Sequence, residues 1–325
     1  MKKFLKILGI ILCSVLLIIT AIIAYIKIAL PDVGAAPQIT VDKSAASVER
    51  GYYLANRVMS CMDCHSHRNI NQFTMPLIPA TLGMGGERFD QTEGFPGVFY
   101  SANITPLGIG NWTDGEIYRV ITTGVRKNGK PIFPVMPYHS YGFAAPEDVN
   151  ALVAYLRTLK PIQNKVPESS ADFPMNIILN TIPKKAEPMQ IPPAVDSIAS
   201  GHYLFTIASC YDCHTPFEKG KFDNAFALAG GRVFPMPGGK VSSANITTDK
   251  ETGIGSWTRE FFIQHFASYR DSAVAHRTVN QGDVQTIMPW TLYGNMTDKD
   301  LGNIYAYIQT LKPIRHEVIK WQAGK

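Results

Sequence analysis

The sequence carries little charge, few cysteines and no long low-complexity tract. Only 18% of its residues are charged, and once the four lysines of residues 1–27 are set aside, 27 basic residues face 26 acidic ones. A nucleic-acid-binding protein carries a basic stripe on its folded part, so this near balance excludes nucleic acid as a partner. The five cysteines are neither a disulfide framework nor random scatter, because four of them lie in two short clusters.

Sustained strand-like alternation of apolar and polar residues is also missing. Several segments instead have helical spacing. Residues 47–60 form one, and Thr113 with Glu116 makes a capping box that opens another. A third begins near Pro146 and stops before Pro161, and residues 297–311 match it. We therefore predict an all-α protein.

The N-terminal segment predicts a membrane anchor over residues 1–30. Ile7 to Ile26 is an uncharged run of 20 residues, which at about 1.5 Å per residue spans a hydrocarbon core of ~30 Å. Lysines precede the run, so we expect the N-terminus in the cytoplasm and the rest outside, on the periplasmic side of the inner membrane. A cleaved signal peptide is the alternative. Either reading exports the folded part.

An internal repeat organises the remaining chain. Seven short stretches recur in the same order at offsets of 142 to 152 residues, among them Ser101–Thr105 with Ser243–Thr247 and Thr158–Ile162 with Thr310–Ile314. Residues 161–196 between the copies are rich in proline, which excludes a long helix and indicates a semi-rigid connector. We predict two tandem domains, 45–160 and 197–315.

Each copy contains one Cys-x-x-Cys-His motif, the attachment signal for covalent haem. The motifs are Cys61–His65 and Cys210–His214. Thiols at i and i+3 share one helix face, so both can reach one porphyrin edge, and the next histidine offers a nitrogen to iron. Composition alone gives roughly 0.002 chance matches in this chain. The sequence therefore predicts two covalently bound haem c groups, held by Cys61, Cys64, Cys210 and Cys213, with His65 and His214 as iron ligands.

Other uses of these cysteines fit the sequence poorly. A thioredoxin-like redox pair needs a strand-to-helix setting and a parallel sheet. A zinc site shared between the motifs would have to unite clusters 149 residues apart in the sequence. A disulfide closes across two residues only with difficulty.

Methionines are predicted as the second axial ligands. Met136 and Met288 occupy matching places in the repeat, 71 and 74 residues after their haem histidines, and each precedes proline and the last helix. A methionine in this position raises the reduction potential and closes the iron to small molecules. His139 is the competing ligand in the first copy, but the second copy has Leu292 at the equivalent place.

The sequence resembles the cytochrome c subunits of bacterial membrane-bound alcohol, aldehyde and gluconate dehydrogenases. The stretches that carry the resemblance are Asn103–Thr105, Gly108–Thr113, Met136–Tyr138, Ala151–Pro161, Asn245–Thr247, Thr252–Thr258 and Met288–Trp290. The resemblance implies cytochrome c-like domains, with His65 and His214 as proximal and Met136 and Met288 as distal ligands. It also implies haem-propionate contacts for Trp112, Trp257, Arg88 and Arg232. Members typically carry three haem domains, whereas this sequence has two.

The sequence is compatible with two functions. Two six-coordinate haems predict an electron relay without substrate chemistry. Its partners would be redox proteins (a dehydrogenase, an oxidase or another cytochrome), and electrons would pass from a dehydrogenase to a quinone or terminal oxidase. The alternative is a di-haem enzyme such as a peroxidase, which needs one open haem site. The likeness of the two copies around Met136 and Met288 favours the relay.

Overall fold

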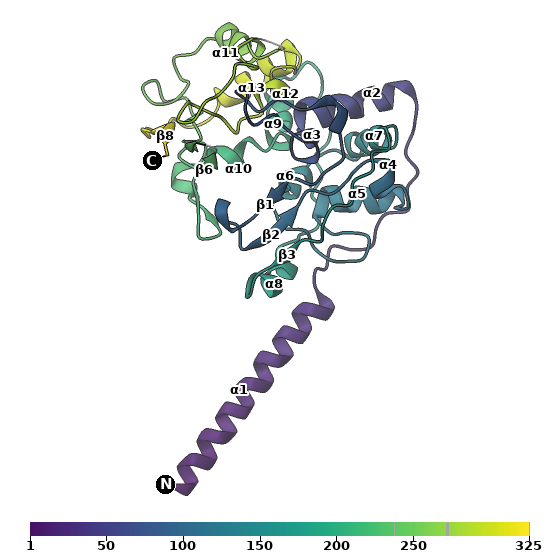
Figure 1. Cartoon of the computed structure of the whole chain (residues 1–325), viewed down its shortest axis with the longest axis vertical. Helices are drawn as coiled ribbons and strands as arrows, with labels where there is room; N and C mark the ends of the chain where they lie inside the picture. The colour runs from purple at the N-terminus through teal and green to yellow at the C-terminus, as the bar shows by residue number, and fades with distance from the viewer. Residues whose placement is uncertain (237, 271–272, 325) are drawn as a thin grey trace.

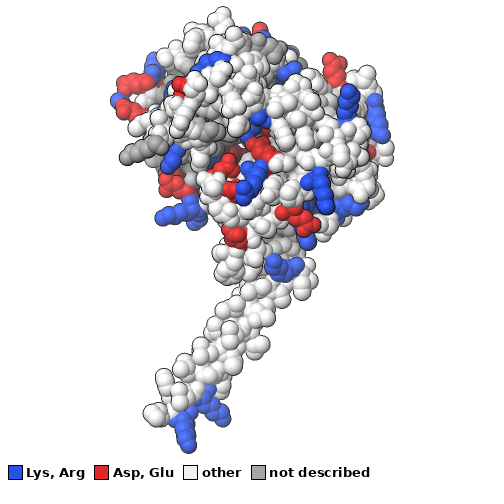
Figure 2. All heavy atoms as spheres, viewed as in Figure 1, with Lys and Arg blue, Asp and Glu red and all other residues white. Residues whose placement is uncertain are grey.

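The computed structural model describes residues 1–236, 238–270 and 273–324. Its first element is α1 (Lys2–Ala29), which projects from the globular part of the molecule (Figure 1). α1 is long and apolar enough to cross a membrane, with a mean hydropathy of 3.1 over its most apolar window. Figure 2 shows its stem free of charged side chains above the lysines at the N-terminal tip.

The first half of the globular part (residues 45–160) is built mainly from helices. α2 (Ala45–Tyr53) continues through the π-helical turn η1 (Leu54–Val58), and α3 (Cys61–His65) follows at once. α4 (Pro106–Ile109), α5 (Asp114–Thr123), α6 (Tyr138–Tyr141) and α7 (Pro146–Leu156) complete it. The predicted capping box is present, because Thr113 Oγ1 accepts from the Glu116 amide while the Glu116 carboxylate accepts from the Thr113 amide.

The second half (residues 197–315) repeats the main helices in the same order. α9 (Ser197–Ile207) and α10 (Cys210–His214) correspond to α2–η1 and α3. α11 (Arg259–Ala267), α12 (Trp290–Tyr293) and α13 (Asp298–Ile308) correspond to α5, α6 and α7. As predicted, α13 begins after Thr297, whose hydroxyl accepts from the Asp300 amide.

First and last helices cross tightly in both halves, α2 on α7 and α9 on α13. A Cβ atom at Gly51 would lie 1.9 Å from the carbonyl oxygen of Ala151, and one at Gly201 would lie 1.9 Å from that of Asn303. Only glycine permits so close a backbone approach. The repeated glycine therefore fixes the same crossing twice.

Short strands qualify the all-α prediction. The described residues contain eight strands of two to four residues: β1 (Arg88–Phe89), β2 (Gly97–Tyr100), β3 (Ser170–Ala171), β4 (Phe217–Glu218), β5 (Lys221–Phe222), β6 (Val233–Met236), β7 (Gly239–Ser242) and β8 (Trp321–Ala323). They pair antiparallel in the orders β1-β2-β3, β4-β5 and β6-β7-β8. The helical prediction is confirmed in its broad form, but "all-α" is too narrow. Strands this short hold too few residues for alternation to show in the sequence.

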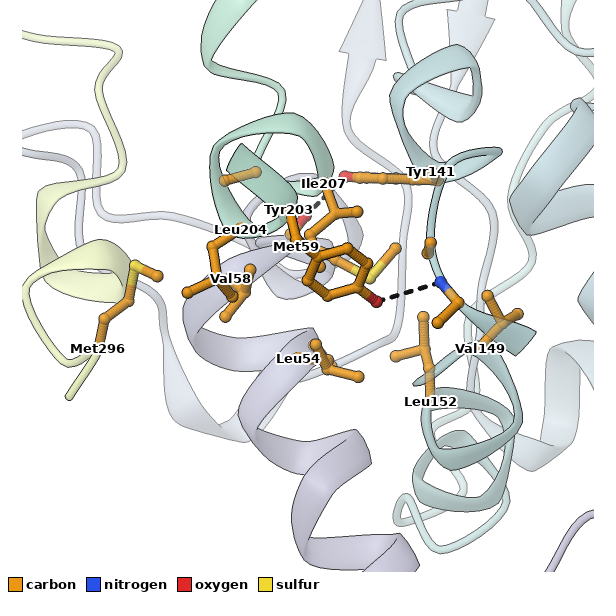
Figure 3. Close-up of a cluster of buried hydrophobic side chains, with 14 of the residues drawn as sticks. Leu54, Val58, Met59, Tyr141, Val149, Leu152, Tyr203, Leu204, Ile207 and Met296 are labelled. Atoms are coloured by element: carbon orange, nitrogen blue, oxygen red, sulfur yellow. Dashed lines mark hydrogen bonds between the residues drawn. The ribbon is translucent and has the colours of Figure 1, made fainter. Parts of the chain in front are cut away.

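One apolar core extends across both halves (Figure 3). Leu54, Val58 and Met59 of the first half are buried together with Leu204 and Ile207 of the second. α6 packs on α9, and α12 packs on η1. Each half thus places the short helix that follows its predicted ligand methionine against the other half.

Two tyrosines cross the boundary between the halves in a reciprocal way. Tyr203 donates its hydroxyl to Asp148 Oδ2 at 2.6 Å and accepts from the amide of Ala145 at 3.1 Å (Figure 3 shows the second bond). At equivalent places in the repeat, Tyr53 donates to Asp300 Oδ2 at 2.5 Å and accepts from the amide of Thr297 at 3.1 Å. These bonds fix the orientation of one half against the other.

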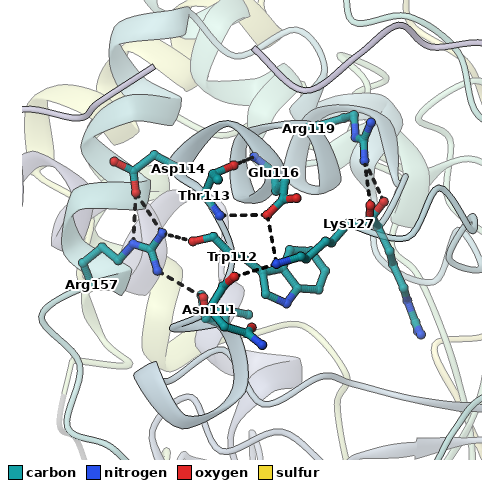
Figure 4. Close-up of polar contacts among 10 residues, drawn as sticks. Asn111, Trp112, Thr113, Asp114, Glu116, Arg119, Lys127 and Arg157 are labelled. Carbon is teal, nitrogen blue, oxygen red and sulfur yellow. Dashed lines mark hydrogen bonds and ion pairs between the residues drawn. The ribbon is translucent and has the colours of Figure 1, made fainter. Parts of the chain in front are cut away.

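Arg157 holds the turn before α5 (Figure 4). Its guanidinium donates to the carbonyl oxygens of Ile109 and Trp112 at 3.1 and 2.5 Å, and to Asp114 Oδ1 at 2.9 and 3.0 Å. Asp114 Oδ2 in turn accepts from the amide of Val41 at 3.1 Å. Trp112 is therefore held in a fixed loop on the way into α5.

Candidate functional site

Each Cys-x-x-Cys-His motif forms a one-turn helix that follows a strained residue. Ser60 and Ser209 have φ of +50° and +58°, in the left-handed region that non-glycine residues seldom adopt. These serines turn the chain from the preceding helix into α3 and α10. Tyr141 donates its hydroxyl to the carbonyl oxygen of Met59, and Tyr293 donates to that of Ala208. A tyrosine thus holds the backbone just before the strained serine in both halves.

Both histidines are oriented through one ring nitrogen. His65 Nδ1 lies 2.7 Å from the carbonyl oxygen of Ala102, and His214 Nδ1 lies 2.7 Å from that of Ala244. A carbonyl oxygen only accepts, so Nδ1 carries the proton and Nε2 keeps its lone pair. This is the arrangement in which proteins present a histidine to a metal ion. Burial also lowers the pKa of both imidazoles, which favours the neutral form that binds metal.

The first motif opens into a cavity of about 490 Å³. Cys61, Cys64 and His65 line it together with Met136, so one space unites the four residues predicted to hold the first haem. Most of the remaining lining is apolar. It includes Phe99, Ile109, Trp112, Ile117, Val120 and Phe133. The volume and lining are those of a small-molecule or cofactor site.

The predicted methionine ligands share a backbone turn. The amide of Tyr138 donates to the Met136 carbonyl oxygen at 2.8 Å, and that of Trp290 donates to the Met288 carbonyl oxygen at 2.7 Å. These turns do not test iron binding, so the roles of Met136 and Met288 as ligands stay predictions that rest on the repeat. His139, the competing ligand, is exposed and does not line the cavity.

The cysteine thiols lack the features expected of a redox pair, a disulfide or a shared zinc site. All five cysteines are free, and burial raises the pKa of Cys61 to about 12, whereas a redox-active pair has a lowered pKa. No group of three His, Cys, Asp or Glu side chains in the described ranges is arranged to hold a metal ion, which leaves the shared zinc site without support.

Comparison with known proteins decides the family. A cytochrome c family profile matches residues 198–312. A "Diheme cytochrome c-type" protein of Cereibacter sphaeroides is 30% identical over 243 residues, which cover 71% of this chain and 76% of that protein. The chain belongs to the cytochrome c family.

Other relatives of this cytochrome c are larger proteins. The "Alcohol dehydrogenase (quinone), cytochrome c subunit" of Komagataeibacter europaeus is 29% identical over 300 residues, covering 86% of this chain and 59% of the relative. The "Fructose dehydrogenase cytochrome subunit" of Gluconobacter japonicus is 29% identical over 309 residues, covering 90% of this chain and 58% of the relative. The chain thus spans less than two thirds of the length of these subunits.

The family implies covalently bound haem c, and the cavity fits that group. Two thiols and a histidine with a free Nε2 lie at its wall, as the attachment chemistry requires. Its apolar lining would take up the porphyrin faces. Arg126 and Lys165 also line the cavity, and either cation could face a propionate. Of the residues that the resemblance gives this role, Trp112 lines the cavity, whereas Arg88 pairs with Asp90 at the surface.

Several residues of the site could not be singled out from the sequence. Tyr141 and Tyr293 occupy equivalent places in the repeat, which is the signal that could have identified them. His265 stands at the repeat position of Val120, which lines the first cavity. Its ring lies among aromatic side chains, with Trp257 at 5.0 Å and Trp290 at 5.1 Å between ring centroids. The structure therefore places a half-buried histidine in an aromatic cluster with Trp257 and Trp290.

Proposed function

We propose that this cytochrome c is a membrane-anchored di-haem electron relay. Residues 1–30 are the anchor, and haem domains 45–160 and 197–315 flank the connector 161–196 on the periplasmic side. One haem is attached to Cys61 and Cys64 with His65 and Met136 as iron ligands. The other is attached to Cys210 and Cys213 with His214 and Met288.

The observation that carries this proposal is the repetition of one histidine arrangement. In both halves the histidine follows the second cysteine, and its Nδ1–H donates to the alanine carbonyl oxygen of the repeated Ser-Ala-Asn-Ile-Thr segment. A histidine that was duplicated for a structural role unrelated to iron would not need a free Nε2 in both halves. Bound haem c supplies a one-electron iron couple.

The protein's own residues then set the conditions of the transfer. The thiols hold the cofactor edge, and the Ala102 and Ala244 carbonyl oxygens keep the imidazoles in register. The apolar lining of the first cavity excludes water, which favours the less charged, reduced form. Ser140 on α6, the helix that follows Met136, donates to Asp212 of the second motif at 3.1 Å, so the segment with the proposed first methionine ligand adjoins the second attachment motif across the boundary between the halves. This supports transfer from one haem to the other.

The names of the relatives support a dehydrogenase as the electron donor. As the acceptor we propose a quinone or a terminal oxidase. The test is to add ethanol, fructose or gluconate to membranes that contain the tagged full chain and to follow haem absorbance. We expect one of these substrates to reduce both haems, and a His214→Ala chain to show reduction at one haem only. If dithionite reduces the haems but no substrate does, the dehydrogenase donor is wrong.

A second measurement separates the relay from an enzyme with an open haem site. The reduced full chain is exposed to carbon monoxide, which binds only an iron with a free or displaceable sixth position. We expect the spectrum to stay unchanged. Binding at a native haem would favour the enzyme.

A further inference from the structure

The connector contains an apolar segment that is largely uncovered. Residues 173–182 include no charged side chain. They form α8 (Met175–Ile178) and the single turn η4 (Leu179–Thr181). Phe173 is 79% exposed and Ile178 is 43% exposed. A globular protein rarely leaves contiguous large apolar side chains in water without a use for them.

This segment lies against the outer end of the membrane-crossing helix. α8 and η4 both contact α1, and Figure 1 shows α8 beside the point where α1 joins the globular part. Ile23 and Ile26 are the residues of α1 that are partly covered, and the rest of that helix is exposed. Lys27 Nζ donates to the carbonyl oxygen of Asn176 at 2.9 Å. At 1.5 Å per residue, Ile23 stands about 6 Å deeper along the helix than Lys27.

The segment is also tied to the first half. β3 pairs with β2 immediately before it, through Gly97 with Ala171 and Val98 with Ser170. The Asp172 amide donates to the carbonyl oxygen of Pro96 at 2.9 Å, and the Asp172 carboxylate accepts from Gln91 Nε2 at 2.9 Å. The apolar segment is therefore held firmly between α1 and the globular part.

We propose that residues 173–182 form a second contact with the membrane, inserted in the outer leaflet at the boundary between headgroups and acyl chains. The inference rests on the proposed membrane anchor. Residues 173–182 lie beside the last two turns of α1. This is the depth at which interfacial segments lie, about 5–10 Å into the boundary between headgroups and acyl chains. Lys184 and Lys185 follow the segment and can reach anionic headgroups.

A second contact would change what the anchor does. A single helix leaves the globular part free to tilt and rotate, whereas two contacts hold it in one orientation. Lys165 and Ser169 of the connector line the first cavity, and Tyr100 of β2 does so as well. The first haem site would then face its partners from a fixed position near the membrane surface.

Spin labelling of the full chain tests the proposal. Cys13→Ala confines the label to one introduced thiol, because the paired cysteines carry haem. Nitroxides are placed at Phe173→Cys and, as an independent variant, Ile178→Cys. Leu17→Cys in α1 is the membrane control, and Ile319→Cys, 68% exposed before β8 in the native chain, is the water control. The chains are reconstituted in phosphatidylcholine vesicles, and relaxation by oxygen is compared with relaxation by a water-soluble nickel chelate.

We expect oxygen to relax the labels at 173 and 178 several-fold more than nickel does, as at 17, with the order reversed at 319. Labels at 173 and 178 that behave like the label at 319, while 17 is embedded, would overturn the second contact and leave the anchor intact. If the label at 17 also behaves like the one at 319, the proposed anchor itself fails. Unchanged haem absorbance in each variant shows that the fold is retained.

Discussion

Replacing Tyr203 by phenylalanine removes one hydroxyl from the boundary between the halves. Tyr203 is 2% exposed, and its hydroxyl bonds both Asp148 and the amide of Ala145. A hydrogen bond to a charged group contributes about 1.5–3 kcal/mol, and a buried amide left unpaired costs about 1–3 kcal/mol. Asp148 keeps its two bonds from Arg50, at 2.7 and 2.8 Å. We therefore expect a loss of about 3 kcal/mol in the free energy of unfolding.

The repeat supplies a matched control, Tyr53→Phe. Tyr53 makes the reciprocal bonds to Asp300 and Thr297, but its bond from the Thr297 amide is exposed, so water can replace the lost hydroxyl. We expect a loss of about 1 kcal/mol there.

Urea unfolding of the detergent-solubilised holoprotein, followed by circular dichroism and by haem absorbance, measures both effects. With a slope of about 3 kcal/mol per molar urea, Tyr203→Phe should lower the midpoint by about 1 M and Tyr53→Phe by about 0.3 M. Equal shifts, or a larger shift for Tyr53→Phe, would refute the account of this boundary.

Three further predictions concern single sites. Gly51→Ala places Cβ 1.9 Å from the Ala151 carbonyl oxygen, so the thermal midpoint should fall by several degrees, whereas Gly9→Ala in α1, with nothing near its Cβ and no positive φ, should not lower it. Burial, partly opposed by Arg68, raises the pKa of the Glu87 carboxyl to about 7. The contribution of this carboxyl to the free energy of unfolding is therefore present below pH 4.5 and is lost as the pH rises to 7, by at most about 3 kcal/mol. Unfolding of Glu87→Gln, measured across this pH range, should lack that loss of stability. Met136→Ala and Met288→Ala should each convert one haem to the high-spin state, and a wholly low-spin electron paramagnetic resonance spectrum of either variant would show that its methionine is not a ligand.

Local signals in the sequence predicted the helices well. The capping residues Thr113 and Thr297 and the starting Pro146 lie where the structure has helix starts, because caps and proline act through the neighbouring few residues. The long apolar helix α1 was equally well predicted, since length and apolarity are read directly from the sequence.

Contacts between residues far apart in the chain could not be predicted from the sequence. Strand β8 exists because Trp321–Ala323 pairs with β7, about 80 residues away in the chain, and β3 exists because it pairs with β2. The carbonyl oxygens of Ala102 and Ala244 orient the histidines. Because every residue has a backbone carbonyl, the residue types in the sequence do not predict which of them bonds a histidine. Likewise, Tyr53 and Tyr203 stand at matching places in the repeat, but the bond that each makes to an aspartate of the other half depends on how the halves pack.

The proposed function depends on haem bound covalently at both thiol pairs. The measurement is the intact mass of the full chain after acid-acetone extraction, made on the wild type and on two double variants, Cys61→Ala with Cys64→Ala and Cys210→Ala with Cys213→Ala. We expect the mass of the polypeptide plus two haem groups for the wild type and plus one haem group for each variant. A wild-type mass with one haem or none, or a double variant that retains both, would contradict it.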